Sequence, residues 1–142
     1  MKALRRFLLT ALFLIIATAT AQAGDWIKLH EQDGITYYIN TDVTQDYDGY
    51  TVWIKEEYTT KAARAKIIKD YSLKRTAYSQ VCCNKYKKSW DERACKAIVF
   101  YSANGTVVES FNYPYLEYIM VIPDSLGYVW AEVAKMIWEA KQ

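Results

Sequence analysis

Three cysteines and one histidine are the residues of this chain whose types could support nucleophilic, redox or metal chemistry. They are Cys82, Cys83, Cys95 and His30. Adjacent residues of a strand point to opposite faces, so only one of Cys82 and Cys83 can face Cys95. We expect a disulfide between Cys83 and Cys95, with Cys82 buried or free. A metal site is the alternative, but three thiols with no nearby His and no C-x-x-C spacing make a poor zinc motif.

The remaining reactive groups do not form a catalytic set. The chain has no G-x-S-x-G, H-E-x-x-H, phosphate-loop or dinucleotide-binding motif. His30 lies beside a turn near Glu31 and Asp33, which is typical of a solvated histidine rather than of a thiol–imidazole pair. We therefore expect no enzymatic activity, no cofactor and no metal. A thiol enzyme that uses Cys82 or Cys83 stays open as an alternative.

Two aromatic segments suggest binding instead. The first is the loop 84–96, where basic side chains surround a Tyr and a Trp, and the second is the tyrosine-rich run 111–118. Aromatic side chains often anchor interfaces, and the cations suit an acidic partner. The candidates for partner binding are Lys85, Tyr86, Lys87, Lys88, Trp90, Arg93, Tyr113 and Tyr115. A solvated hairpin tip and packing over the sheet are the respective alternatives.

The first 23 residues have the three parts of a secretory signal peptide. Lys2, Arg5 and Arg6 precede the apolar run 7–17, and Ala21-Gln22-Ala23 is a small-residue cleavage site. The run is shorter than the roughly 20 residues that span a bilayer, which argues against a transmembrane anchor. We expect cleavage to leave one exported domain, 24–142, in the periplasm, at the cell surface or secreted.

Signal cleavage also changes the charge. It removes three of the 18 basic residues and none of the 16 acidic ones, so the mature domain has a net charge of −1 with its histidine neutral. This balance does not indicate nucleic acid or an anionic membrane as a partner.

An exported protein meets an oxidising compartment, which favours a disulfide.

The patterning of the mature chain predicts one α+β domain with an antiparallel sheet of about six strands. The predicted strands are 26–29, 35–40, 50–58, 73–83, the hairpin 97–111, and 115–122. A short helix is predicted at 61–70, capped by Thr59 or Thr60. A C-terminal helix is predicted at 124–141, capped by Asp124 or Ser125, and its apolar stripe has to cover the sheet.

Asn104-Gly105 is the strongest hairpin signal in the chain, because a two-residue type I′ turn needs positive φ at both central positions. The opposite pairs that this turn predicts are Tyr101–Val108, Phe100–Glu109, Val99–Ser110 and Ile98–Phe111. Both faces of the hairpin would then be apolar. We therefore expect the hairpin in the middle of a sheet that is covered on both sides.

Several short motifs follow one another along the mature chain in a particular order. They are Trp26, Tyr37-Tyr38-Ile39-Asn40, Val52-Trp53-Ile54-Lys55 with Tyr58, a Cys after the next strand, the Asn-Gly turn within 101–108, and Ile122-Pro123-Asp124-Ser125. In this order they resemble the surface-adhesin protein E family of exported bacterial proteins. The resemblance implies an antiparallel sheet carrying a helix, and a binding protein of the envelope or surface. The family's named member adheres to host matrix and serum proteins such as laminin, vitronectin and plasminogen.

Two features depart from that family. Members often place a Cys near the end of the last helix, where it pairs with the mid-chain Cys. The last helix of this chain has no Cys up to Gln142, so Cys95 would be the residue that pairs with the mid-chain Cys instead. There is also no lipid-attachment Cys after the cleavage site. The predicted function is that of an exported, non-enzymatic binding protein with a protein partner. The alternative is a periplasmic structural or assembly factor that acts through its aromatic surface, and the oligomeric state is left open.

Overall fold

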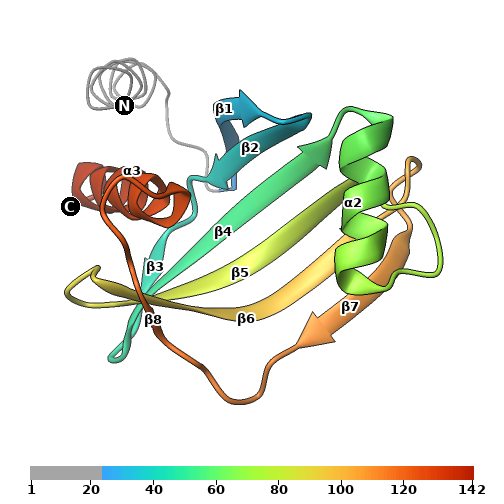
Figure 1. Ribbon diagram of the computed structural model, residues 1–142. Helices are drawn as coiled ribbons and strands as arrows, with labels where there is room; N and C mark the ends of the chain where they lie inside the picture. The colour runs from blue at the N-terminus through green and yellow to red at the C-terminus, as the bar shows by residue number, and fades with distance from the viewer. Residues whose placement is uncertain (1–23) are drawn as a thin grey trace.

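The described chain, residues 24–142 of a computed structural model, forms one antiparallel sheet with two helices in front of it (Figure 1). The long strands are β1 (Trp26–Gln32), β2 (Ile35–Asn40), β4 (Gly49–Tyr58), β5 (Ser79–Lys87), β6 (Glu92–Tyr101) and β7 (Val107–Asn112). Two short strands, β3 (Thr44–Gln45) and β8 (Ile119–Met120), pair with β4 and β6. The helices are α2 (Lys61–Tyr71) and α3 (Leu126–Ala140). The predicted signal peptide lies outside the described residues.

The order of the long strands is β1-β2-β4-β5-β6-β7, and every pairing is antiparallel. This confirms the predicted α+β class and the six-stranded antiparallel sheet. Both helices cover the same face of the sheet, because Val52 and Ile54 of β4 contribute to the core under α3 while Tyr58, of the same parity, contributes to the core under α2.

α3 covers the β1, β2 and β4 side of the sheet, as its predicted apolar stripe requires. Ser125 caps the helix by accepting a hydrogen bond of 3.2 Å from the Tyr128 N–H, which identifies the cap among the two predicted residues. Trp130, Val133 and Ile137 are among its buried side chains. The amphipathic periodicity of the sequence is therefore a reliable guide to this helix.

α2 covers the other half of the same face. Its cap is Thr60, whose side chain accepts a 3.1 Å hydrogen bond from Ala63 N–H. Ile67 enters a second core cluster with Phe100, and Tyr71 at the end of the helix lies 4.8 Å from the Phe100 ring. The second cluster therefore ties the β4–β5 connection to β6.

The opposite face of the sheet carries neither of the described helices. Trp53 of β4 is exposed there, and the Lys55 ammonium lies 4.4 Å from the Tyr38 ring centre and 5.1 Å from the Trp26 ring centre. Lysine stems and aromatic rings thus cover the apolar surface of this face in place of a helix.

Two predicted strand boundaries are wrong. Residues 73–78 are not strand, since β5 begins only at Ser79, and Leu73 and Ala77 are instead buried in the cluster under α2. The segment 115–122 does alternate, but only Ile119 and Met120 reach a partner strand, opposite Arg93 and Glu92. Hydrophobic alternation alone does not produce a strand where no sheet edge is within reach.

The central hairpin has a different turn from the predicted one. Gly105 takes positive φ and donates to the Ser102 carbonyl at 3.1 Å, while Ser102 N–H donates to the Thr106 carbonyl at 2.8 Å. This is a three-residue loop, a type I turn followed by a left-handed Gly, rather than a two-residue type I′ turn. The three-residue loop shifts the pairing by one residue, and Val108 is an extra residue of β7 between the pairs Phe100–Glu109 and Tyr101–Val107.

The bulge changes the last pair of the hairpin. The pairs Ile98–Phe111, Val99–Ser110 and Phe100–Glu109 are confirmed, but Tyr101 lies opposite Val107 instead of Val108. Val108 consequently packs on the cluster under α2, and Val107 is exposed. The expectation of a central hairpin covered on both sides is also wrong, because β7 is the edge strand and is mostly exposed.

Candidate functional site

Most of the predicted basic loop belongs to the strands β5 and β6, so its candidate residues lie in different environments. Lys85 is only 6% exposed, and its ammonium lies 2.5 Å from an Asp46 carboxylate oxygen and 3.1 Å from the Thr51 hydroxyl. The ring of Trp90 stacks on Tyr50 with 4.0 Å between ring centres. Lys85 and Trp90 therefore hold the fold together at this end of the sheet.

Tyr86, a further candidate, is fully buried between β5 and α3. Its hydroxyl donates a 3.1 Å hydrogen bond to the Gly127 carbonyl in the first turn of the helix. Burial in this environment raises the pKa of the hydroxyl well above its usual range. Tyr86 is therefore a core residue, which the sequence pattern alone did not reveal.

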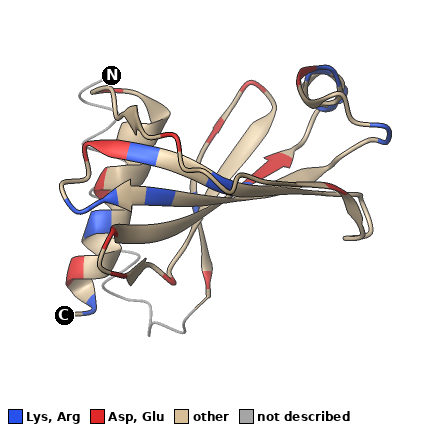
Figure 2. Cartoon of the chain, turned by 90° about the horizontal axis from the view of Figure 1, so that it is seen from below, with Lys and Arg blue, Asp and Glu red and all other residues tan. Residues whose placement is uncertain are grey.

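The two remaining lysines lie at the tip of the β5–β6 hairpin and are exposed. Lys87 pairs with Glu92 at 3.1 Å and lies 4.8 Å from the Tyr118 ring centre, while Lys88 follows it in the turn. Figure 2 shows Lys and Arg interspersed with Asp and Glu along the chain. The two exposed lysines are a small part of the basic cluster that the sequence spacing suggested.

The tyrosine-rich candidates belong to a segment that we call the strap, residues 113–122, which connects β7 to α3 (Figure 1). The strap touches the edge of β6 at both ends. Tyr113 N–H donates to the Lys96 carbonyl at 2.9 Å, and Val121 N–H donates to the Asp91 carbonyl at 2.7 Å. Between these contacts it bends away from the sheet, as the orange loop of Figure 1 shows.

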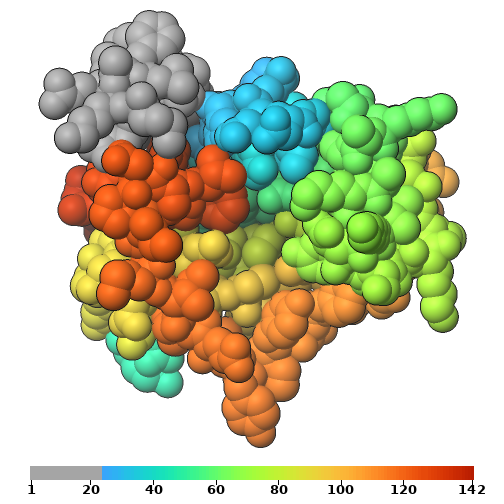
Figure 3. Space-filling model, viewed as in Figure 1, coloured from blue at the N-terminus to red at the C-terminus, as the bar shows by residue number. Residues whose placement is uncertain are grey.

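A groove of about 650 Å³ lies between the strap and β6. Its lining comprises Tyr71 of α2, Arg93, Ala94, Cys95 and Ile98 of β6, and Tyr113, Pro114, Tyr115, Glu117 and Ile119 of the strap. In the space-filling view the strap projects from the body of the molecule beside this region (Figure 3). The groove therefore combines apolar and aromatic walls with one guanidinium and one carboxylate.

The strap also carries most of the large apolar side chains that are exposed in the described chain. Tyr115 is 86% exposed and Met120 is 75% exposed. Tyr113, Ile119 and Ile122 are exposed as well. Single exposed apolar residues are ordinary, but five within ten residues form a patch of the kind that marks interaction surfaces.

Arg93 connects this patch to the core. Its guanidinium lies 5.5 Å from the Trp130 ring centre, and one nitrogen lies 3.5 Å from the Asn84 side-chain oxygen. The arginine is therefore held in place by α3 and β5 while it still lines the groove. A positioned guanidinium at one side of an apolar groove suits an amphipathic ligand.

The cysteines lie differently from the predicted pair. Cys82 and Cys95 face each other with 3.2 Å between their sulfur atoms, and Cys83 is buried against the opposite face of the sheet, with Ala97 as its cross-strand partner. All three are free thiols. The predicted disulfide between Cys83 and Cys95 is therefore wrong, and Cys82 is the cysteine that faces Cys95.

A bulge in β6 accounts for this exchange. Cys83 pairs with Ala97, but the next residue, Asn84, pairs with Cys95, so Lys96 is an extra residue in the ladder. Regular alternation would place Cys95 on the same face as Cys83. The extra residue moves Cys95 to the face of Cys82, because each one-residue shift reverses the side-chain direction.

The environment of the two facing thiols makes them unequal. The hydrogen bond between the two thiols lowers the pKa of Cys95, while that same hydrogen bond, together with burial, raises the pKa of Cys82 well above the usual thiol range. Glu56 lies on the same face of the sheet, and burial raises the pKa of its carboxyl, which accepts a 3.1 Å hydrogen bond from the Tyr58 hydroxyl. The more acidic thiol is the one that lines the groove.

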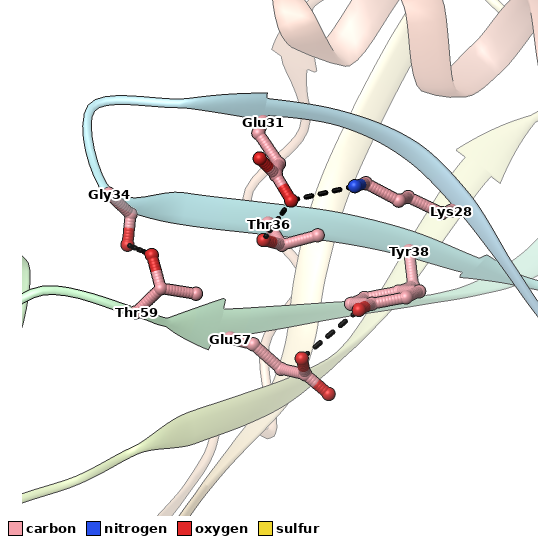
Figure 4. Close-up of polar contacts among 7 residues, drawn as sticks. All are labelled: Lys28, Glu31, Gly34, Thr36, Tyr38, Glu57 and Thr59. Atoms are coloured by element: carbon pink, nitrogen blue, oxygen red, sulfur yellow. Dashed lines mark hydrogen bonds and ion pairs between the residues drawn. The ribbon is translucent and has the colours of Figure 1, made fainter.

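A second set of polar contacts holds β1, β2 and β4 together on the open face (Figure 4). Glu31 accepts hydrogen bonds from Lys28 at 2.6 Å and from Thr36 at 3.3 Å, and Tyr38 donates to Glu57 at 3.0 Å. The hydrogen bond from Lys28 lowers the pKa of the Glu31 carboxyl. These pairs join neighbouring residues or adjacent strands, and their geometry is that of structural cross-strand contacts.

Two further findings for residues 24–142 concern metal ligands and helix length. No three His, Cys, Asp or Glu side chains there are close enough to hold a metal ion. Neither α2 nor α3 is long and apolar enough to cross a membrane.

Comparison with known proteins gives no relative. No protein-family model matches this chain, no curated protein does so, and no solved structure does so. The residues that form the groove therefore have to be understood from their own contacts.

Of the eight partner-binding candidates, Arg93, Tyr113 and Tyr115 line the groove. Sequence reasoning missed Tyr71 and Glu117, which no local motif distinguishes.

Proposed function

We propose that this protein is an exported, non-enzymatic binding protein that holds a protein partner in the groove between β6 and the strap. The observation that carries the proposal is the concentration of exposed apolar side chains on the strap beside a groove of about 650 Å³. Ligand sites of soluble proteins commonly have volumes of roughly 300 to 1,000 Å³ and mostly apolar walls. The groove has the size and lining of such a site.

The side chains around the groove indicate the chemistry of the partner. Tyr113 and Tyr115 supply amphipathic aromatic surface, which is favoured at interfaces because it buries a large area at a small cost in side-chain entropy. Arg93, fixed against Trp130, offers a guanidinium to a carboxylate. We therefore favour a partner that inserts an apolar or aromatic side chain next to an acidic group.

The resemblance to the surface-adhesin protein E family suggests which partners to test first. Laminin, vitronectin and plasminogen are the appropriate immobilised ligands for surface plasmon resonance. The variant to compare with the unchanged protein is Tyr115→Ser combined with Met120→Ser and Ile122→Ser, which removes three exposed side chains of the strap. We expect at least a tenfold weaker binding by this variant.

Tyr47→Ser is the matched control, because Tyr47 is also 86% exposed but belongs to the β3–β4 turn rather than to the strap. Its affinity should stay within twofold of the unchanged protein. Thermal unfolding of each variant checks that the fold is intact. Full affinity in a folded strap variant, or no binding to any of the three ligands by the unchanged protein, would contradict the proposal in this form.

The open face of the sheet favours a second candidate function, that of an envelope structural or assembly factor. Trp53 is exposed there beside Lys55, and the described helices leave that face uncovered. Such a protein would associate with itself or with envelope components through this aromatic surface. Light scattering that finds a strict monomer at millimolar concentration would argue against the dimeric form.

A further inference from the structure

We infer that Cys82 and Cys95 form a dithiol beside the groove that small-molecule disulfides oxidise, with Cys95, which lines the groove, as the attacking thiol. The two sulfur atoms lie 3.2 Å apart on neighbouring strands, and both side chains are half-buried. This inference concerns thiol chemistry of the protein itself and does not depend on the protein partner proposed above.

The architecture of the sheet brings these two thiols together. Cys82 lies opposite Ile98 and Cys95 lies opposite Asn84, so the cysteines are diagonal neighbours across the bulge at Lys96. The bulge turns the Cys95 side chain to the face that carries Cys82. The strands on both sides, β4 and β7, keep β5 and β6 in register, so the short distance between the sulfurs is built into the ladder.

The groove gives the two thiols different access. Cys95 is one of the residues that line it, together with Tyr71 and Tyr113, whereas Cys82 is not part of the lining. The hydrogen bond between the two thiols lowers the pKa of Cys95, which favours the thiolate at the accessible sulfur. Cys95 is therefore placed to attack an incoming disulfide, and Cys82 is placed to complete the exchange.

The exchange proceeds in two balanced steps. The Cys95 thiolate attacks one sulfur of a disulfide R–S–S–R, a Cys95–S–S–R bond forms, and one R–S⁻ leaves and takes up a proton. The Cys82 thiol then loses its proton to solvent and attacks the Cys95 sulfur, which displaces the second R–S⁻. Two electrons pass from the protein to the small disulfide, two R–SH molecules are released, and the protein holds a Cys82–Cys95 disulfide.

The test exposes the reduced protein to hydroxyethyl disulfide, traps the remaining thiols with iodoacetamide and measures the intact mass. The unchanged protein should lose two of its three thiols. Cys82→Ser should accumulate a mixed disulfide on Cys95, and Cys95→Ser should react at least tenfold more slowly. Cys83→Ser is the matched control and should react at the rate of the unchanged protein, because Cys83 lies on the other face.

Peptide mapping is a second measurement, and it leaves both Cys82 and Cys95 unchanged. After oxidation, the Cys83→Ser protein should yield a disulfide-linked peptide pair that joins Cys82 to Cys95. Retention of three free thiols in the unchanged protein, or a mixed disulfide on Cys83, would overturn the inference. Equal reaction rates of the unchanged protein and folded Cys95→Ser would overturn the role of Cys95 as the attacking thiol.

Discussion

Removing the hydroxyl of Tyr86 tests the contact that joins the sheet to α3. The hydroxyl is fully buried and donates a 3.1 Å hydrogen bond to the Gly127 carbonyl. Tyr86→Phe keeps the ring and its packing but removes this donor, so we expect a loss of about 1 kcal/mol in the free energy of unfolding. Tyr86→Ala also removes the ring from the core and should cost about 4 kcal/mol, by analogy with other buried aromatic residues.

Urea unfolding followed by far-ultraviolet circular dichroism measures both losses. For a domain of this size, about 1 kcal/mol corresponds to a fall of roughly 4 °C in the unfolding temperature. Tyr115→Phe is the matched control, because the Tyr115 side chain is 86% exposed and its change should stay within about 0.5 kcal/mol. A Tyr86→Phe protein within about 0.3 kcal/mol of the unchanged one, at the same urea dependence, would refute the assigned role of the hydroxyl.

Two further predictions concern the same sheet. Burial raises the pKa of Glu56, so the folded state binds its proton more tightly than the unfolded state, and stability falls as the pH rises through the raised pKa. Glu56→Gln should therefore be more stable than the unchanged protein at pH 8 and equal to it at pH 3 in urea unfolding, and an equal difference at both values would contradict this assignment. Gly49 has a φ of +150°, and an added Cβ would lie 2.0 Å from the Tyr86 carbonyl oxygen. Gly49→Ala should cost about 3 kcal/mol in thermal unfolding against about 1 kcal/mol for Gly105→Ala, where φ is also positive but space is open, and equal losses would count against the close approach.

Local signals in the sequence were sufficient for the helices and the fold class. The caps Thr60 and Ser125 lie directly before residues of helical periodicity, and both accept the expected backbone hydrogen bond. The predicted strands 35–40 and 50–58 also correspond to β2 and β4, to within one residue at each end. These features depend on contacts within a few residues, which a single sequence displays directly.

The errors in side-chain direction arose where one additional residue turns the side chains that follow it to the other face of the sheet. Lys96 exchanges the cysteine that faces Cys95, and the three-residue loop before Thr106 exchanges Val107 and Val108. A strand sequence with a bulge differs little from one without it, because both contain the same residues in the same order. The prediction of a basic loop failed because β5 extends to Lys87, and this part of the strand buries Asn84, Lys85 and Tyr86.

The groove is formed by the course of the strap beside β6 and not by a sequence motif. After β7 the chain has to travel from the middle of β6 to the first residues of that strand before α3 can begin, and the strap covers this distance in ten residues that contact β6 only near the two ends of the strap. The width of the groove therefore depends on the length of the strap. Insertions or deletions between Tyr113 and Ile119 would therefore widen or close the cavity while every strand pairing of the long sheet stays in place.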